Sequence, residues 1–170
     1  METSQINPAK ISQRGLVIGA NNAPITVIEF INLRCPYCKQ WFEKAAPLLE
    51  PAVQNGRVKR FFKFFDKPKE KLQKGNVAQH HIPYAQPEKA YAAIKFLFAH
   101  QKDWGENLSH SEIDDYIERQ LALPKQPNQT MIDLVLKETQ AANIQFVPTI
   151  IIGAAIFDEK ITPAELTKLI

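Results

Sequence analysis

The chain has 170 residues, 45% hydrophobic and 23% charged, which is the composition of an ordinary globular protein. Its formal net charge is +3, and its basic residues are mixed with acidic ones apart from a denser patch over residues 57–74. We interpret that patch as a solvated face, so nucleic acid is not an expected partner. The chain has two cysteines, too few for the disulfide framework of a small secreted protein.

The N-terminal region shows no targeting segment. Residues 1–14 form a polar arm without the apolar core of a secretory signal. No stretch approaches the ~20 apolar residues needed to span a membrane. The sequence as it stands therefore predicts a cytoplasmic protein, although removal of an export signal would leave the same sequence and place it outside the cytoplasm.

The first third of the chain predicts a strand–helix–strand unit with a right-handed crossover. Residues 16–18 are typical of an edge strand, and the β-branched and aromatic run 25–31 predicts a strand buried on both faces. Residues 36–54 carry a helical apolar stripe, in which Pro47 should kink or split the helix. Residues 58–65 predict a second buried strand.

The middle of the chain, from about residue 68 to residue 142, has helical patterns and no strand pattern. Apolar side chains at helical spacing predict helices over residues 87–100, 109–121 and 130–142. Residues 104–105, a Trp-Gly pair, are assigned to a loop packed on these helices. We read this block as a helical insertion.

Strand character returns after the helical block. Residues 147–152 predict a strand entered through Pro148, and residues 155–157 predict a return strand after a tight turn. Residues 163–170 begin with a capping box and predict a terminal helix. Together the elements predict an α/β fold, a central sheet of four to five strands with helices on both faces.

The two cysteines lie three positions apart where the first buried strand passes into the first helix. Pro36 is favoured at a first helical position, so Cys35 is expected at the N-cap with its sulfur over unpaired N–H groups. These groups and the helix dipole lower the pKa of a thiol. Cys38 lies one turn further along the same face, within reach of Cys35. The pattern predicts thiol–disulfide exchange, with Cys35 as nucleophile and Cys38 as resolving cysteine.

Zinc binding is the alternative reading of the cysteine pair. A closed zinc site needs four ligands, and the candidate partners are His80 and His81. These histidines are adjacent, whereas paired zinc histidines usually lie three to five positions apart. We therefore expect no metal.

Two further residues stand out near the cysteines. Glu29 lies inside the apolar strand before Cys35, and we interpret it as a proton shuttle for Cys38. The alternative is a glutamate at the strand edge that reaches solvent. Pro148 removes a ladder donor at the start of a strand, and the residues alone leave open whether its peptide bond is cis or trans.

Three separated motifs resemble the DsbA-like branch of the thioredoxin superfamily. They are residues 23–30, the run Cys35-Pro36-Tyr37-Cys38 and residues 146–149. The resemblance implies a thioredoxin-like fold with an inserted helical domain. Its domain boundaries would be a polar arm at 1–14, a thioredoxin-like domain at 15–66 and 143–170, and the helical domain at 67–142.

The resemblance also implies roles for the site residues. Cys35 and Cys38 are similar to the family's nucleophile and resolving cysteine, and Glu29 is similar to its buried acidic residue. Pro148 matches the family's cis-proline. Val147 before it offers backbone pairing to an extended substrate peptide.

The dipeptide between the cysteines, Pro36 and Tyr37, is also assigned to substrate binding. The strongly oxidising DsbA proteins carry Pro-His at these positions. Tyr37 offers a phenol in place of an imidazole, so the thiolate should be less stabilised and the potential less oxidising. The family is mostly exported, and this sequence shows no export signal.

The implied function is that of a protein thiol–disulfide oxidoreductase. It would need no cofactor beyond its own Cys35–Cys38 disulfide. It would act as a monomer on protein thiols or disulfides, together with an unidentified redox partner. Two alternatives stay open: a glutathione-dependent isomerase or transferase of the same fold, and a non-catalytic peptide-binding or chaperone module.

Overall fold

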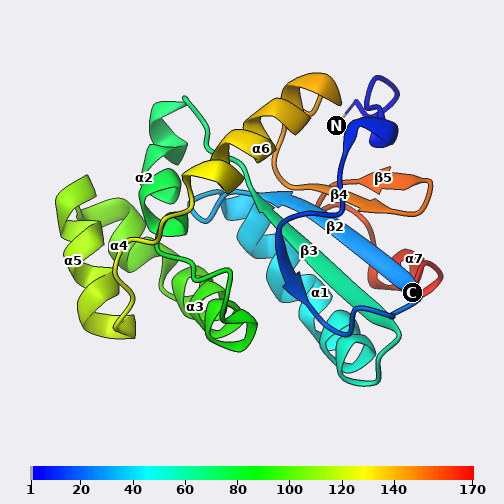
Figure 1. The fold of residues 1–170 in the computed structure, drawn as a ribbon, viewed down its shortest axis with the longest axis horizontal. Helices are drawn as coiled ribbons and strands as arrows, with labels where there is room; N and C mark the ends of the chain where they lie inside the picture. The colour runs from blue at the N-terminus through cyan, green and yellow to red at the C-terminus, as the bar shows by residue number, and fades with distance from the viewer. Residues whose placement is uncertain (1) are drawn as a thin grey trace.

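A mixed five-stranded sheet forms the centre of the protein, for which a computed structural model describes residues 2–170 (Figure 1). Its strands are β1 (Leu16–Ile18), β2 (Ile25–Ile31), β3 (Val58–Phe64), β4 (Thr149–Ile152) and β5 (Ala155–Phe157). The strand order is β1-β3-β2-β4-β5, with β2 parallel to β3 and antiparallel to β4. The five strands and the edge position of β1 confirm the predicted sheet.

Helices α1 (Pro36–Gln54) and α7 (Pro163–Thr167) pack on one face of the sheet. Their apolar stripe meets the inward side chains of β2, β3 and β4, including Val27 and Ile150. Pro47 was expected to kink or split the first helix, and the split is wrong, since α1 runs unbroken through it. Buried side chains lie on both sides of Pro47, for example Trp41 and Leu49, so packing on the sheet holds both halves in one helix.

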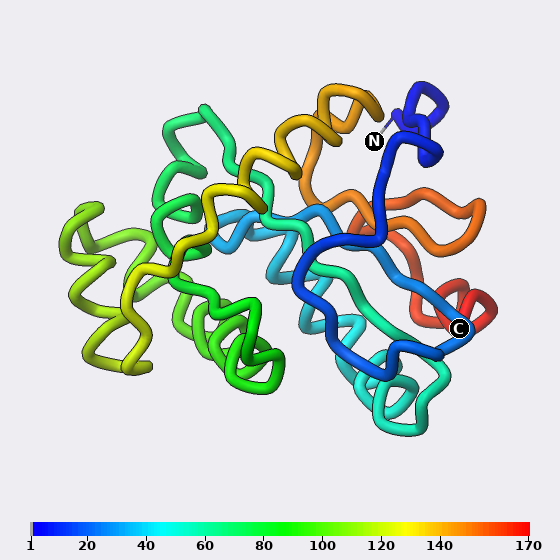
Figure 2. The backbone as a smooth tube through the Cα atoms, in the orientation of Figure 1, coloured from blue at the N-terminus to red at the C-terminus, as the bar shows by residue number. Residues whose placement is uncertain are grey.

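The helical block contains five helices within the described residues. They are α2 (Glu70–Gln79), α3 (Pro87–Ala99), α4 (Gln101–Asn107), α5 (His110–Leu121) and α6 (Gln129–Ala141). The predicted helices α3, α5 and α6 are confirmed. Helices α2 to α5 gather at one end of the sheet, as the tube in Figure 2 shows.

Two helices of this block were not predicted from the sequence. Helix α2 is rich in polar residues and buries little, so it carries no clear apolar stripe. The assignment of residues 104–105 to a loop is wrong, because both lie in α4. Trp104 is fully buried and its Nε1 donates a hydrogen bond to the Leu97 carbonyl at 2.8 Å, so packing stabilises this short helix.

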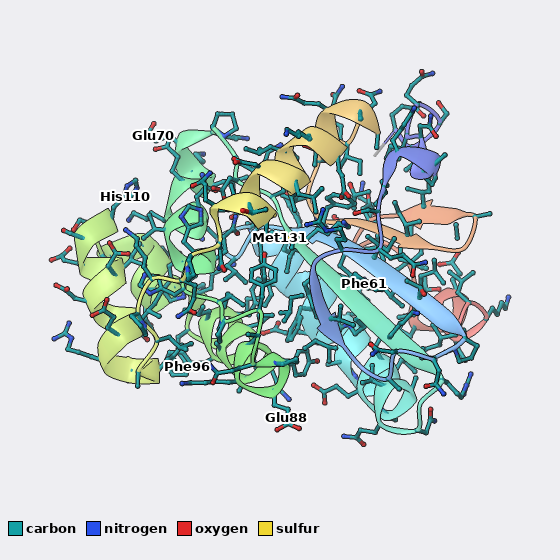
Figure 3. All side chains as sticks on the ribbon, viewed as in Figure 1. Phe61, Glu70, Glu88, Phe96, His110 and Met131 are labelled. Atoms are coloured by element: carbon teal, nitrogen blue, oxygen red, sulfur yellow. The ribbon has the colours of Figure 1, made fainter. Side chains whose placement is uncertain are left out.

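Helix α6 and the N-terminal arm cover the sheet face opposite α1. Val135 of α6 packs with Phe30 and Ile151, and side chains fill the space between the layers (Figure 3). Glu138 forms a buried ion pair with Lys63 at 2.6 Å. The arm is tied to α6, since the backbone N–H of Ser12 donates to Glu138 at 2.9 Å. The domain boundaries stay a prediction.

A bilayer crossing requires a helix that is both long and apolar. None of the helices in residues 2–170 has both properties.

Candidate active site

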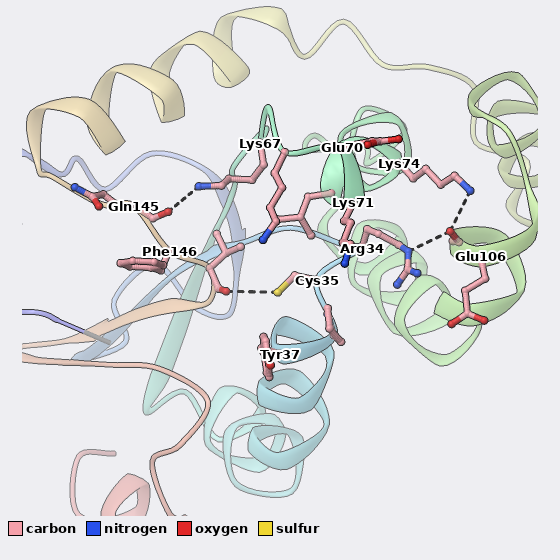
Figure 4. A pocket seen from close by; sticks show the side chains of 15 residues that line it. Arg34, Cys35, Tyr37, Lys67, Glu70, Lys71, Lys74, Glu106, Gln145 and Phe146 are labelled. Carbon is pink, nitrogen blue, oxygen red and sulfur yellow. Dashed lines mark hydrogen bonds between the residues drawn. The ribbon is translucent and has the colours of Figure 1, made fainter.

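Cys35 is the N-cap residue of α1, with Pro36 at the first helical position, as predicted. Its side chain is 4% exposed, and Sγ lies 3.4 Å from the carbonyl oxygen of Val147, to which the thiol donates (Figure 4). The pKa of Cys35 is lowered to about 7, chiefly by a hydrogen bond from the Cys38 thiol. Burial opposes this change, and the N–H groups of Cys38 and Tyr37 contribute to it.

Cys38 lies on the first turn of α1 and is fully buried. The backbone N–H of Asn32 donates to its Sγ at 3.4 Å. Burial raises the pKa of Cys38 well above its ordinary value, and the interaction with Cys35 raises it further. Both cysteines are free thiols in the structure. Near neutral pH the pair therefore consists of a partly ionised Cys35 and a protonated Cys38.

The turn before Cys35 is held by amide side chains from the helical block. The Gln101 Nε2 donates to the carbonyl oxygens of Leu33 at 2.7 Å and of Cys35 at 3.1 Å. The Gln79 Oε1 accepts from the Leu33 N–H at 3.4 Å. Both glutamines are buried. Sequence reasoning missed these residues, because their contacts join segments that lie more than forty positions apart.

Asn32 links the same turn to α2. Its side chain is fully buried, and Nδ2 donates to the Asn76 Oδ1 at 2.9 Å. Helix α2 approaches closely here, since a Cβ added at Gly75 would lie 2.0 Å from the Asn32 Oδ1. Asn32 therefore connects the packing of α2 to the backbone N–H that contacts Cys38.

Glu29 lies on β2 and is fully buried, so the alternative of a solvent-reaching glutamate is wrong. It has charged and polar partners: Arg60 Nε and Nη2 lie 2.6 and 2.9 Å from its two oxygens, and Trp41 Nε1 donates at 2.7 Å. Arg60 in turn donates to the Tyr91 hydroxyl at 3.0 Å. Within residues 2–170, no hydrogen bond joins Glu29 to Cys38 directly. Its role as a proton shuttle stays a prediction.

The peptide bond between Val147 and Pro148 is cis, as the family resemblance implies. The loop that contains it places the Val147 carbonyl against Cys35. Phe146 before it is 54% exposed, and Tyr37 on α1 is 56% exposed. Two large exposed aromatic side chains thus lie close to the Cys35 turn.

A cleft of about 1000 Å³ opens beside Cys35 (Figure 4). Of the residues predicted to bind substrate, Pro36, Tyr37 and Val147 line it, whereas Pro148 is buried and does not. A cleft of this size that reaches a low-pKa thiol can hold a ligand in contact with the sulfur.

Two charged residues near the cysteines were also missed. Lys67 lines the cleft, and its Nζ lies 4.1 Å from the centre of the Phe65 ring. Burial lowers the pKa of Lys67, while the negative charge of Cys35 acts in the opposite direction. Glu159 is buried, and its charge raises the pKa of both cysteines. Lys67 belongs to the basic patch 57–74 that was interpreted as a solvated face, and Glu159 belongs to no local motif.

The histidines of the zinc alternative have other partners. His80 Nε2 pairs with Asp66 at 2.7 Å, and His81 Nε2 pairs with Asp114 at 2.8 Å. Across residues 2–170, no cluster of three or more His, Cys, Asp or Glu side chains could hold a metal ion. The structure therefore does not bring the cysteines and histidines together.

A family model described as thioredoxin matches residues 12–170. A conserved protein of unknown function from Enterococcus faecalis is 49% identical, with a TM-score of 0.96 over 99% of this chain and 97% of that chain. No curated protein matches the sequence.

Two more distant structures share the fold. BdbD from Bacillus subtilis, in its oxidised form, is 17% identical with a TM-score of 0.61, over 91% of this chain and 88% of that one. A candidate protein-disulfide isomerase from Pseudomonas syringae is 17% identical with a TM-score of 0.72, over 91% and 96%. These matches confirm the predicted thioredoxin-like fold with a helical insertion.

Proposed function

This chain belongs to the thioredoxin family, and from that premise we propose that it exchanges disulfides with protein thiols through Cys35 and Cys38. The observation that carries the proposal is the contrast within the pair. The pKa of Cys35 is lowered to about 7 and that of the buried Cys38 is raised. This contrast provides one thiol that is partly ionised, and so nucleophilic, near neutral pH. The second thiol stays protonated until it resolves the mixed disulfide.

In the reducing direction, the Cys35 thiolate attacks one sulfur of a substrate disulfide. A bond forms between Cys35 and that sulfur, and the second substrate sulfur leaves with the electron pair and takes up a proton. Cys38 then loses its proton and attacks Cys35, which releases the first substrate sulfur as a thiol. The substrate disulfide gains two electrons and two protons, and the Cys35–Cys38 dithiol loses them. The oxidising direction is the reverse sequence.

Similar structures give the proposal its chemical context. One of them is a candidate protein-disulfide isomerase, and another is BdbD in its oxidised form. Both share the fold of this chain at low sequence identity. The wall of the cleft at Val147 would receive the peptide that carries the reacting cysteine.

The proposal is tested by single serine substitutions at the two cysteines. Cys35→Ser should abolish turnover of a protein disulfide substrate. Cys38→Ser should instead trap a mixed disulfide between Cys35 and the substrate, visible on a non-reducing gel and by mass spectrometry. The double variant is the matched control and should form no adduct.

Two results would contradict the proposal. Wild-type turnover by the Cys35→Ser protein, with circular dichroism showing that both variants are folded, would remove Cys35 from the reaction. An adduct at Cys38 in the Cys35→Ser protein that forms as fast as the adduct at Cys35 in the Cys38→Ser protein would contradict the assigned order of the two thiols.

A further inference from the structure

The cleft beside Cys35 carries an excess of positive charge. Two carboxylates line it, those of Glu70 and Glu106. The cationic side chains that line it are Arg34, Lys67, Lys69, Lys71 and Lys74. Figure 4 shows the two carboxylates pointing away from the Cys35 sulfur. The lining of the cleft is therefore cationic overall.

Little of this charge is neutralised within the described residues, although the charge of Lys74 acts on Glu112 and helps to lower its pKa. None of the five cations forms an ion pair in the part of the chain that the structure describes. Arg34 Nε and Lys74 Nζ both donate to the Gly105 carbonyl at 3.2 Å, and Lys67 Nζ donates to the Gln145 carbonyl at 2.7 Å. A carbonyl oxygen orients a cation without cancelling its charge. A cleft lined mainly by positive charge focuses the field and attracts anions.

The arrangement fits an extended chain. The cations come from the Cys35 turn, from the segment after β3 and from α2, so they are spread along the cleft. Its other side offers the exposed aromatic rings of Phe146 and Tyr37. The volume of about 1000 Å³ lies at the upper end of small-molecule sites. An extended peptide, at about 3.3 Å per residue, can place several carboxylates along such a row.

We propose that the cleft beside Cys35 binds an acidic polypeptide segment. The preferred substrates would then be proteins with several acidic residues close in sequence to the reacting cysteine. This inference rests on the proposed disulfide exchange and names its substrate class. The cations strengthen the binding of acidic segments and speed their encounter with the protein. The two cysteines carry out the disulfide exchange itself.

The test compares three peptides of one length. Each carries a single cysteine as a mixed disulfide with mercaptoethanol, flanked by Asp and Glu, by Asn and Gln, or by Lys. The second-order rate constant of the reduced protein is measured for each peptide. The acidic peptide should react about tenfold or more faster than the neutral one, and the basic peptide slowest. The preference should shrink between about 0.01 M and 1 M salt, as the Debye length falls from about 30 to 3 Å.

Two exposed lysines allow a variant that leaves the fold intact. Lys69 and Lys71 are exposed, and no side-chain hydrogen bond or ion pair holds either of them in the described residues. Lys69→Gln/Lys71→Gln should reduce the preference for the acidic peptide, measured as the ratio of the acidic to the neutral rate constant. The matched control is Lys89→Gln/Lys137→Gln, which removes two exposed lysines outside the cleft. The control should keep the wild-type preference.

The outcomes separate this inference from the proposed function. Equal rates for all three peptides at low salt would overturn the acidic-segment proposal and leave the exchange reaction standing. No reaction with any peptide, the neutral one included, would remove the proposed function. A small dianionic disulfide, dithiodipropionate, is compared with neutral bis(hydroxyethyl) disulfide. The contrary result is a preference for the dianionic disulfide over the neutral one that is as large as the preference for the acidic peptide over the neutral peptide, and that is lost in Lys69→Gln/Lys71→Gln. This result would assign the cleft to small anionic disulfides and overturn the polypeptide proposal.

Discussion

Arg60 holds both carboxylate oxygens of Glu29, with Nε 2.6 Å from one and Nη2 2.9 Å from the other. Both side chains are fully buried. The parallel register of β2 and β3 pairs Val27 with Arg60 and Glu29 with Phe62, so the two charges lie diagonally on one sheet face. The pair links the two central strands beneath the helix that carries the cysteines.

Breaking this pair should destabilise the protein strongly. Glu29→Gln leaves the Arg60 guanidinium buried without a counter-charge, and the free energy of unfolding should fall by about 3–5 kcal/mol. Urea denaturation followed by circular dichroism measures the change. The comparison variant is Lys95→Gln, which removes an ion pair to Glu50 whose lysine is 52% exposed and should cost less than about 1 kcal/mol. Equal losses of unfolding free energy in the two variants would show that the buried pair contributes no more than the exposed one, contrary to this prediction.

The lowered pKa of Cys35 predicts the pH dependence of its reactivity. Alkylation of the reduced protein by iodoacetamide should rise with pH and reach half its maximal rate near pH 7, because the thiolate is the reactive form. Cys38 should stay unmodified throughout, since it is buried and its pKa is raised. Peptide mapping identifies the alkylated residue. A midpoint at the ordinary thiol value, about 8.5, would show that the hydrogen bonds to Cys35 do not lower its pKa.

The lowered pKa of Cys35 also fixes the direction in which the stability of the reduced protein changes with pH. The native pKa of Cys35 lies below that of the unfolded chain, so between about pH 7 and 8.5 the unfolded state binds more protons. The reduced protein should therefore become more stable as pH rises through this window and lose that contribution as pH falls through 7. Cys35→Ser should remove this part of the pH dependence, measured by urea denaturation at each pH.

The pKa of Cys35 also predicts the redox potential. A strongly lowered thiolate pKa stabilises the reduced form, and DsbA combines a pKa of about 3.5 with a potential of about −120 mV. A pKa of about 7 matches thioredoxin, whose potential is about −270 mV. Equilibration of the Cys35–Cys38 couple with glutathione buffers should therefore give a value nearer to −270 mV. A value near −120 mV would indicate a thiolate stabilised by contacts other than those described.

Two helical glycines offer a matched pair of variants. A Cβ at Gly75 would meet the Asn32 Oδ1 at 2.0 Å and the Arg34 backbone nitrogen at 2.7 Å, so Gly75→Ala must displace the turn before Cys35. The three atoms nearest to a Cβ at Gly105 all belong to the Arg34 side chain, the closest at 2.5 Å, and that flexible chain can move aside. Gly75→Ala should cost about 1–3 kcal/mol or more of stability and alter the alkylation midpoint of Cys35. Gly105→Ala should change both far less, and the reverse order would contradict this packing.

Local sequence determined the element that positions Cys35. A buried strand, a short turn and a proline after Cys35 specify a helix N-cap, because these preferences act between near neighbours. The capping boxes at Ser109 and Thr162 are formed as such local rules require. Helix α2 has a weak local pattern, and it was missed for that reason.

The surroundings of the cysteines were decided by tertiary structure. Arg60 reaches Glu29 through the register of two strands, and Gln101 reaches the Cys35 turn across more than sixty residues. The cations of the cleft gather only when α2 packs beside the turn that carries Arg34. Contacts of this range depend on how elements pack, and residue type and spacing do not encode them locally. The sequence alone thus determined where the cysteine pair lies, at the N-cap and first turn of α1, while packing decided the charges around it.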